Sequence, residues 1–501
     1  MGMEGQRIRV EVDASTGLPS YDTVGLPDKA IKESRERVRS AIRNSGYTLP
    51  PRRITVNLAP AGMKKVGSLY DLPIAIALMQ ANGILALPTP EMLDQSIFVG
   101  ELALSGEIRP VHGVLPMAIM ARKEGISYFF CPKENAAEAS YIQGLQVIGV
   151  RDLAEICQLL EGGLPLPAQK KRDWQPAAVA AENDFCFIKG QLVAKRAAEI
   201  AAAGGHNMLM IGHPGGGKTM LARAMPGILP DLSFEEALEI SQIYSILGKL
   251  DASGLVQQRP FVAPHHSVSM AALVGGGGAA RPGEISLAHL GVLFLDEMPE
   301  FQRDALEGLR QPLEDGIATI SRVHASSTYP ARFMLVGAMN PCPCGYFGSK
   351  YHTCNCSEKR IQNYRKRLSG PLIDRIDMFV SMQELHYDDF HQKSLPSEDS
   401  AAIRQRVDGA RKRQAQRLKD RQGIFCNGQM KQQDIEASCV LDAAAERFLA
   451  AEFQRQHFNG RTNARILRLS RTIADLDGVD VIQEYHVAEA IQYRQMDQIW
   501  T

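Results

Sequence analysis

One stretch constrains the fold of this chain more than any other: HNMLMIGHPGGGKTMLARAM, residues 206–225. Four apolar residues, Met208–Ile211, have the character of a buried strand, and an Ala- and Leu-rich helix is expected after the loop. The glycine-rich loop between them lets backbone N–H groups and the helix N-terminus surround phosphates. The pattern predicts a P-loop α/β domain in which Lys218 contacts the phosphates of ATP and Thr219 holds Mg²⁺. The predicted ATP-binding residues are Gly212, His213, Pro214, Gly215, Gly216, Gly217, Lys218 and Thr219.

Two later strand ends supply groups that ATP hydrolysis requires. In GVLFLDE, a buried strand is expected at Val292–Leu295. Asp296 then adds a second Mg²⁺ group, and Glu297 is expected to orient and deprotonate the attacking water. In MLVGAMNP, a third strand ends at Asn340, whose amide can fix that water against the γ-phosphate. Acidic strand ends are common, but after a P-loop this one indicates an ATP hydrolase.

Three arginines can bring positive charge to the transferred phosphate. Arg375 lies between two aspartates in GPLIDRIDMFV. It either forms an ion pair there or reaches the nucleotide of a neighbouring subunit as an arginine finger. The helix expected at GRTNARILRLSRTIADL offers Arg461 and Arg465, one of which can close over the nucleotide from a lid.

Composition narrows the class of protein. Basic and acidic side chains are equal in number, 56 of each, so any polyanion site has to be local. No apolar run approaches the about 18 residues of a membrane-spanning helix, and the N-terminus has neither a secretory nor a myristoylation pattern. We therefore expect a cytoplasmic protein without membrane contact, in which structural disulfides are not expected.

Four of the nine cysteines lie close together in NPCPCGYFGSKYHTCNC, as C-x-C, nine residues and C-x-C. Because Gly345 and Gly348 allow the chain to fold back, these thiols are predicted to hold a structural Zn²⁺. The predicted ligands are Cys342, Cys344, Cys354 and Cys356, and His352 can replace one of them. A cysteine-rich loop without metal and a redox sensor are the alternatives.

The chain divides into an N-terminal α/β domain (1–165), a Pro-, Gly- and Ala-rich linker (166–183), the P-loop domain (184–395) and a helical lid (396–501). In the first domain, RRITVNLAP predicts a strand, DLPIAIALMQANG a helix, and SIFVGELALSGEIRPV a hairpin that turns at Ser105-Gly106. In the lid, residues 404–421 carry eight Lys/Arg against two Asp. This charge indicates a solvated helix face or, alternatively, contact with a polyanion.

These parts, in this order, resemble the AAA+ ATPases. Further segments are similar to the magnesium-chelatase-like ComM/YifB family, bacterial AAA+ proteins linked to natural transformation. They are APHHSVSMAALVGGG, RPGEISLAHLGVLFLDEMPEF, LRQPLEDG, MNPCPCG and SGPLIDRIDMFV. The resemblance covers essentially the whole chain. It implies Walker A at Gly212–Thr219 and Walker B at Asp296 and Glu297, and it further implies sensor 1 at Asn340, the arginine finger at Arg375 and sensor 2 at Arg461.

The N-terminal region resembles the proteolytic domain of Lon, which the recombination ATPase RadA shares. The similar segments are VNLAPAGMKKVGSLYDLPIAIAL and GELALSGEIRPVHGVLP. Proteolysis requires a Ser nucleophile and a Lys base. Asp71 falls at the nucleophile position and Val114–Met117 at the Lys position, while Ser68 with Lys64 or Lys65 is an alternative pair. We therefore expect a non-proteolytic domain for binding or assembly.

Residues 316–333 alternate like two short strands around Val323-His324 and resemble the pre-sensor hairpin of the AAA+ clade that contains the MCM helicases. Such hairpins point into the pore of a ring, which implies DNA contacts for Arg322, His324 and Arg332. An ordinary surface hairpin is the alternative. APHHSVSMAALVGGGG resembles the helix-two insertion of the same clade, with a mobile glycine run. Adjacent imidazoles seldom point the same way, so we do not expect a metal at His265 and His266.

The resemblance implies a hexameric, ATP-driven DNA helicase or translocase that acts by branch migration. It would extend incoming single-stranded DNA into a homologous duplex during transformation, with branched DNA and recombination proteins as partners. The alternative is a chelatase-type ATPase that remodels a partner protein for metal insertion. An ATP-dependent protease would require the Ser-Lys pair that the N-terminal region fails to supply at the matching positions. The residues by themselves support an AAA+ ring ATPase.

Overall fold

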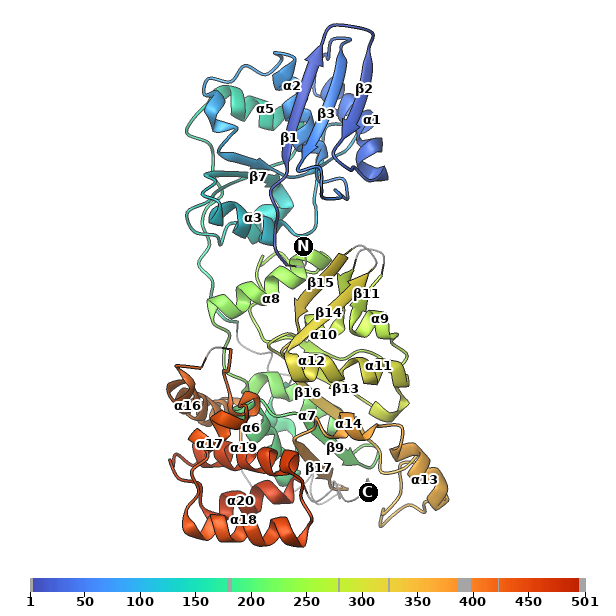
Figure 1. Cartoon of the computed structure of the whole chain (residues 1–501), viewed down its shortest axis with the longest axis vertical. Coiled ribbons are helices and arrows are strands. Elements are labelled where there is room, and N and C mark those ends of the chain that lie inside the picture. The colour runs from blue at the N-terminus through green and yellow to red at the C-terminus, as the bar shows by residue number, and fades with distance from the viewer. Residues whose placement is uncertain are drawn as a thin grey trace. The chain divides into compact units, whose positions relative to one another are not determined.

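The computed structural model describes residues 3–177, 183–277, 280–322, 325–384, 398–421 and 423–494, with the side chains of 321, 322, 325 and 326 left out. The chain forms two compact units, whose elements are labelled in Figure 1. Unit 1 comprises Met1–Gln175 and Phe234–Gln257, and unit 2 comprises Pro176–Ser233 and Gln258–Thr501. Both are mixed α/β, as expected. No helix within the described residues combines the length and the apolar character that crossing a bilayer requires.

Unit 1 is organised by two small sheets. In the first, of order β1-β3-β2, the central strand pairs antiparallel with β1 and parallel with β2. The second, of order β4-β7-β8, is parallel. Alternate residues of β3 (Val56, Leu58) are buried against Leu72 and Ile76 of α2, which gives the unit its main core. The elements are β1 (Arg9–Ser15), β2 (Ser20–Val24), α1 (Lys29–Asn44), β3 (Arg53–Ala59), α2 (Asp71–Ala81), η1 (Pro90–Met92), β4 (Ser96–Phe98), β5 (Glu101–Leu102), β6 (Ile108–Arg109), α3 (Val114–Lys123), β7 (Tyr128–Pro132), η2 (Lys133–Asn135), α4 (Ala136–Ala139), β8 (Gln146–Val150), α5 (Leu153–Gly162) and α8 (Phe234–Leu247).

The hairpin predicted from SIFVGELALSGEIRPV is smaller in the structure. Only β5 and β6 pair antiparallel around the turn at Ser105-Gly106. Residues 96–98 leave the hairpin and pair parallel with β7 as β4. The reason is burial, because the ring of Phe98 stacks on that of Phe130, with 4.7 Å between ring centroids.

Residues 234–257 follow the P-loop helix in sequence but pack in unit 1. Leu238 and Leu255 join a second apolar core around Val114 and Leu115. Ser245 makes three bonds there: its carbonyl accepts from the N–H of Gly113 at 2.9 Å, and its hydroxyl donates to Glu138 at 2.5 Å and accepts from the N–H of Leu115 at 3.3 Å. This segment is therefore a structural part of the N-terminal unit.

Part of the predicted linker is also fixed in unit 1. The indole N–H of Trp174 donates to the carbonyl of Val256 at 3.1 Å, and its ring lies edge-on to Phe234. Arg172 donates to the carbonyls of Ala252 and Ser253 at 3.2 and 3.1 Å. An aromatic and an arginine thus tie the middle of this stretch to the segment 234–257.

The centre of unit 2 is a parallel five-stranded sheet of order β10-β13-β16-β9-β17. Strands β9, β13 and β16 are buried along their whole length, as expected for a parallel sheet covered on both faces. These strands are neighbours, so Gly212, Asp296 and Asn340, which end or follow them, meet at one edge of the sheet. Ligands of open α/β sheets bind at this carboxyl edge.

The C-terminal helices pack on α6 at one face of this sheet. Ile403 of α16 and Leu469 of α19 share an apolar core with Ala197 of α6 and Met210 of β9. The elements of unit 2 are η4 (Phe185–Phe187), α6 (Leu192–Gly204), β9 (Met208–Gly212), α7 (Lys218–Ala224), η5 (Met225–Ile228), β10 (Phe261–Val262), α9 (Met270–Leu273), β11 (Gly275–Gly276), β12 (Arg281–Pro282), α10 (Glu284–Leu287), β13 (Val292–Leu295), η6 (Met298–Glu300), α11 (Arg303–Gly308), α12 (Arg310–Asp315), β14 (Ile317–Arg322), β15 (Ala325–Pro330), β16 (Met334–Met339), α13 (Glu358–Arg365), α14 (Gly370–Ile373), β17 (Met378–Met382), α16 (Ser400–Leu418), η7 (Asn427–Gln429), α17 (Gln432–Ser438), α18 (Ala443–Arg455), α19 (Gly460–Leu476) and α20 (Glu484–Gln492).

The basic stretch of α16 is partly bound within unit 2 and partly solvated. Four of its arginines are bound within unit 2: Arg404 pairs with Asp231, Arg406 with Glu199 and Glu398, and Arg417 with Asp475, while Arg411 donates to the carbonyl of Ala202. These contacts hold the helix to its neighbours, while Lys412 and Arg413 on the same helix are exposed and form a solvated part of its surface.

Candidate nucleotide site and cysteine cluster

The P-loop joins β9 to α7 through a tight backbone turn. Gly215 and Gly217 have φ of 79° and 83°, in the left-handed region that glycine adopts without strain. The Lys218 side chain folds back into the loop, and its Nζ donates to the carbonyls of Gly212 at 2.7 Å and His213 at 2.9 Å. Burial lowers the pKa of Lys218, although Asp296 and Glu297 act in the opposite direction. The loop therefore holds a buried cation at its centre, where a polyphosphate would be neutralised.

A hydroxyl and a carboxylate meet beside this lysine. Oγ1 of Thr219 donates to Oδ2 of Asp296 at 2.8 Å, and the other carboxylate oxygen of Asp296 accepts the N–H of Glu297 at 2.9 Å. Mg²⁺ prefers such oxygen ligands and usually binds one or two protein groups together with phosphate oxygens. Thr219 and Asp296 thus fit the predicted magnesium site.

Glu297 follows Asp296 in a strained conformation. Its φ of 49° is unusual for a residue with a long side chain, and such strain gathers at functional sites. Its carboxylate is half exposed and lies 3.7 Å from Nδ1 of His266. The rings of His265 and His266 lie tilted at 34° to each other, with 4.1 Å between centroids. His266 was not predictable as the neighbour of Glu297, because the two are far apart along the chain.

Asn340 completes the arrangement from the neighbouring strand end. Its Oδ1 accepts a hydrogen bond from Nζ of Lys218 at 3.1 Å. The structure therefore brings Lys218, Thr219, Asp296, Glu297 and Asn340 to one carboxyl edge of the sheet.

The three candidate arginines of unit 2 lie in different surroundings. Arg375 pairs with Glu314 and donates to the carbonyls of Arg310 at 2.9 Å and Pro371 at 2.8 Å. Arg461 is exposed, with Nη1 3.5 Å from Asp374. Arg465 is mostly buried, with Nε 3.7 Å from Asp377.

Asp377 is an ionised partner for Arg465. Burial opposes its ionisation, but the imidazole of His206, whose Nδ1 lies 3.8 Å away, and the charge of Arg465 outweigh burial and lower the pKa of Asp377 to about 2. Of the two lid arginines, Arg461 is therefore the one whose side chain faces solvent, while Arg465 is held by a buried carboxylate.

Strands β14 and β15 form an antiparallel hairpin in which Arg322 pairs with Ala325. His324 and the side chain of Arg322 lie outside the described residues. Arg332 follows the second strand, at the base of the hairpin. Its guanidinium lies over the ring of Phe425, 5.3 Å from the centroid.

The glycine run of the helix-two insertion contributes a strand. Gly275 and Gly276 pair antiparallel with Pro282 and Arg281 as β11 and β12. Residues 278 and 279 lie outside the described part of the chain. Two of the three described glycines, Gly275 and Gly276, are thus paired with a neighbouring strand.

The four predicted zinc ligands gather in one place. The Sγ atoms of Cys342, Cys344, Cys354 and Cys356 all lie within 4.8 Å of one another. Three of the Sγ–Sγ distances are 3.3, 3.7 and 3.6 Å. A tetrahedron with Zn–S bonds of about 2.3 Å has edges of about 3.8 Å, so the cluster fits a Cys₄ zinc site. The ring of the fifth candidate, His352, lies tilted against that of Tyr346, with 4.6 Å between centroids.

The pKa of one thiol in the cluster is shifted toward the thiolate, the form that binds metal. The N–H of Tyr346 and then the thiol of Cys342 stabilise the thiolate of Cys344, which lowers its pKa to about 6. Each of the nine cysteines is free of disulfide bonds.

The candidate protease residues of unit 1 are engaged elsewhere. Asp71 is buried and accepts two hydrogen bonds from Arg37, at 2.8 and 3.0 Å. The hydroxyl of Ser68 donates to Glu101, while Nζ of Lys65 donates to the carbonyls of Gly25 and Pro60. These contacts give each group a structural partner.

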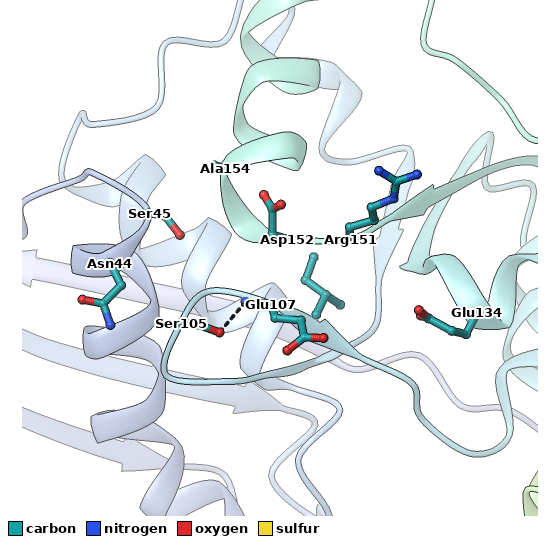
Figure 2. Close-up of a pocket in the computed structure, with 9 residues that line it drawn as sticks. Asn44, Ser45, Ser105, Glu107, Glu134, Arg151, Asp152 and Ala154 are labelled. Carbon is teal, nitrogen blue, oxygen red and sulfur yellow. Dashed lines mark hydrogen bonds between the residues drawn. The ribbon is translucent and has the colours of Figure 1, made fainter.

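A hollow of about 490 Å³ lies in unit 1. Figure 2 shows the carboxylates of Glu107, Glu134 and Asp152 around it, together with Arg151. Three carboxylates against one guanidinium make it a poor site for a nucleotide, since like charges repel the phosphates. It contains none of the residues predicted to bind ATP.

Comparison with known proteins gives three family matches along the chain. Residues 184–390 match "Magnesium chelatase, subunit ChlI", residues 10–135 match "Subunit ChlI of Mg-chelatase", and residues 397–494 match "Magnesium chelatase, subunit ChlI C-terminal". The first contains the whole nucleotide site and the cysteine cluster.

Full-length relatives narrow the family. An Escherichia coli protein named YifB, described as uncharacterized, is 43% identical over 499 residues, covering 100% of this chain and 96% of the relative. The competence protein ComM of Haemophilus influenzae is 42% identical over 499 residues, which cover 99% of this chain and 96% of the relative. A Lon protease of Bacillus subtilis is 27% identical over 149 residues, or 28% of this chain and 26% of the relative. With these matches along its whole length, the chain belongs to the magnesium-chelatase-like ComM/YifB family.

Proposed function

We propose that the protein is an ATP-driven DNA motor, a helicase or translocase that works as a hexamer and migrates DNA branches during natural transformation. Its family of AAA+ proteins indicates an ATPase. The observation that carries the proposal is the convergence of Lys218, Thr219, Asp296, Glu297 and Asn340 at one sheet edge.

Each of these residues takes one part in hydrolysis. Lys218 neutralises the phosphates, and Thr219 and Asp296 hold the Mg²⁺, which supplies further charge neutralisation when bound. Glu297 orients and deprotonates water, and Asn340 positions that water. Arg375 of one subunit serves the nucleotide of the next, for which it has to leave Glu314. Arg461 closes over the nucleotide from the lid.

DNA as the substrate rests on two supports. A relative with 42% identity along its whole length bears the name competence protein. The hairpin β14–β15 supplies a two-stranded projection next to Walker B in the sequence, and six copies would place Arg322, His324 and Arg332 around a pore. Single-stranded and branched DNA would be bound there, with recombination proteins as partners.

A second candidate function is favoured by the family descriptions, which name a magnesium chelatase subunit over all three segments. In that case the ATPase remodels a partner protein for metal insertion. The two functions differ in their response to DNA, because a remodelling ATPase has no reason to hydrolyse ATP faster on a DNA fork.

The decisive experiment measures steady-state phosphate release with and without forked or four-way-junction DNA, with Glu297→Gln as the inactive control. We expect several-fold stimulation and ATP-dependent movement of the junction. A rate that no DNA changes, together with no DNA binding at low salt, would reject the motor and favour protein remodelling.

Mixing two inactive variants tests whether Arg375 acts as an arginine finger on the nucleotide of a neighbouring subunit. Arg375→Ala and Glu297→Gln subunits are each expected to be inactive alone. In a mixed ring, an Arg375→Ala subunit beside a Glu297→Gln neighbour forms a complete site, so activity should return. No recovery, despite mixed rings by mass measurement, would mean that Arg375 acts within its own subunit.

The cysteine cluster is proposed to hold one structural Zn²⁺. Four sulfur ligands leave no open coordination position, so the metal would have no catalytic role. Metal analysis of the purified protein tests this proposal, with one zinc per chain as the expected content.

A further inference from the structure

The cysteine loop, residues 341–357, lies directly against the P-loop. Nε2 of His213 is 3.2 Å from the carbonyl oxygen of Phe347, and because a carbonyl only accepts, this nitrogen carries the hydrogen. Gly345 has a φ of 88°, and a Cβ placed on it would be 2.7 Å from Cγ of Pro214. Two residues of the predicted ATP site therefore touch the loop without room for a larger side chain.

A third contact attaches the cysteine loop to the P-loop. The carboxylate of Glu384 lies 3.4 Å from Nδ1 of His213 and also accepts the N–H of Lys350 at 3.3 Å. The imidazole of His213 is thus held between Phe347 and Glu384. At its start, the loop follows Asn340, whose side chain bonds Lys218.

The loop has little regular structure to hold it in this place. Residues 341–357 include no helix or strand, and a loop of this length without secondary structure needs another restraint. Inside the loop, the N–H of Phe347 donates to Sγ of Cys342 at 3.3 Å, so the residue that contacts His213 is itself tied to a cluster thiol. A metal on the four thiols would crosslink both arms of the loop.

We propose that Zn²⁺ on Cys342, Cys344, Cys354 and Cys356 fixes the position from which Gly345 and Phe347 brace the P-loop, so that loss of the metal weakens ATP binding. The inference rests on the proposed ATP and zinc sites. The metal acts at a distance, through the backbone of the loop on His213 and Pro214, and it touches no phosphate.

The test compares the zinc-loaded and zinc-depleted full-length protein. Zinc is removed with a thiol-reactive mercurial and a chelator, then restored with reductant and zinc chloride, and its content is followed by elemental analysis. The Kd of a fluorescent ATP analogue is expected to rise about tenfold on depletion and to recover on reloading. Cys354→Ser/Cys356→Ser should behave like the depleted protein, while Cys186→Ser, which changes a cysteine outside the cluster, should keep both zinc and affinity.

A thermodynamic cycle that combines zinc depletion with His213→Ala separates an effect transmitted through His213 from a general loosening of the fold. In His213→Ala the zinc content should be unchanged and the Kd already raised. Zinc depletion should then change the Kd less than about threefold, because the contact that transmits the effect is gone.

An unchanged Kd on depletion of the wild-type protein would overturn the brace and leave the ATP site standing. A tenfold effect that persists in His213→Ala, or a chain that binds no zinc, would overturn it as well. Failure of the zinc-loaded protein to bind the analogue would instead refute the proposed ATPase.

Discussion

Two sets of a lysine, a hydroxyl and an aspartate in this molecule have opposite outcomes. Near the start of α2 in unit 1 are Lys65, Ser68 and Asp71, and at the start of α7 in unit 2 are Lys218 and Thr219, facing Asp296. Both lysines are buried, with 1% and 8% of their surface exposed, and burial lowers the pKa of each.

The difference lies in what surrounds each set. In unit 1 the lysine, hydroxyl and carboxylate each have a separate partner, and Asp71 is paired with Arg37. In unit 2 the hydroxyl bonds the carboxylate directly, and the lysine lies inside a loop of backbone N–H groups. Charges that are matched pairwise hold a fold together, whereas charges that converge on one point can bind a ligand.

The largest expected effect comes from exchanging the two lysines for a residue without charge. Lys218→Met should reduce steady-state ATP hydrolysis by about 10³-fold, or about 4 kcal/mol, since the phosphates lose their buried cation. Lys65→Met should keep hydrolysis within about threefold, because its ammonium serves two carbonyls of unit 1. Equal losses of ATP hydrolysis in both variants would contradict the contrast between the two sites.

The next effect concerns the fold of unit 1. Asp71→Leu leaves the guanidinium of Arg37 half-buried without its carboxylate and should lower the free energy of unfolding by about 3 kcal/mol. The double variant Arg37→Met/Asp71→Leu should recover most of that loss. Chemical denaturation followed by circular dichroism measures both, and a single variant as stable as the wild type would show that the pair is dispensable.

Thr219→Ala should have a smaller effect on turnover. Removal of one magnesium group is expected to slow hydrolysis about 30-fold, near 2 kcal/mol, and to raise the Mg²⁺ concentration needed for half-maximal rate. Measurement of the hydrolysis rate of this variant as a function of Mg²⁺ concentration checks this expectation. A lower maximal rate with an unchanged magnesium dependence would place Thr219 outside the metal site.

Ser68→Ala is the matched hydroxyl deletion and should have the smallest effect. Loss of its bond to Glu101 is expected to cost about 1 kcal/mol of stability, with hydrolysis within about twofold of the wild type. A casein-degradation assay of the wild type and of Asp71→Ser should show no proteolysis by either. Proteolysis that Ser68→Ala abolishes would reverse the interpretation of unit 1.

Local patterns in the sequence were enough to predict which residues meet at the carboxyl edge of the central sheet. The strand before Gly212, the turn to Lys218 and the strands ending at Asp296 and Asn340 are each determined by neighbouring residues, and parallel pairing brings their ends together. The four cysteines were predictable for the same reason, since all lie within a short loop.

Contacts between distant residues were not predictable. Glu314 as the partner of Arg375, His266 beside Glu297 and the pairing of β4 with β7 depend on tertiary packing that no local pattern contains. The same holds for α16, whose arginines find carboxylates far away in the sequence. A run of charge specifies polarity but not partners.

The place of residues 234–257 in unit 1 has a consequence for biosynthesis. Leu238 and Leu255 complete a core whose other members lie before residue 176. On a ribosome that adds about 5–20 residues per second, the first unit must wait several seconds, while the P-loop strand and helix emerge, before it can finish folding. The N-terminal unit is thus first to be translated but cannot be first to mature alone, and a nascent chain released before residue 238 would expose the apolar face that Leu238 and Leu255 cover.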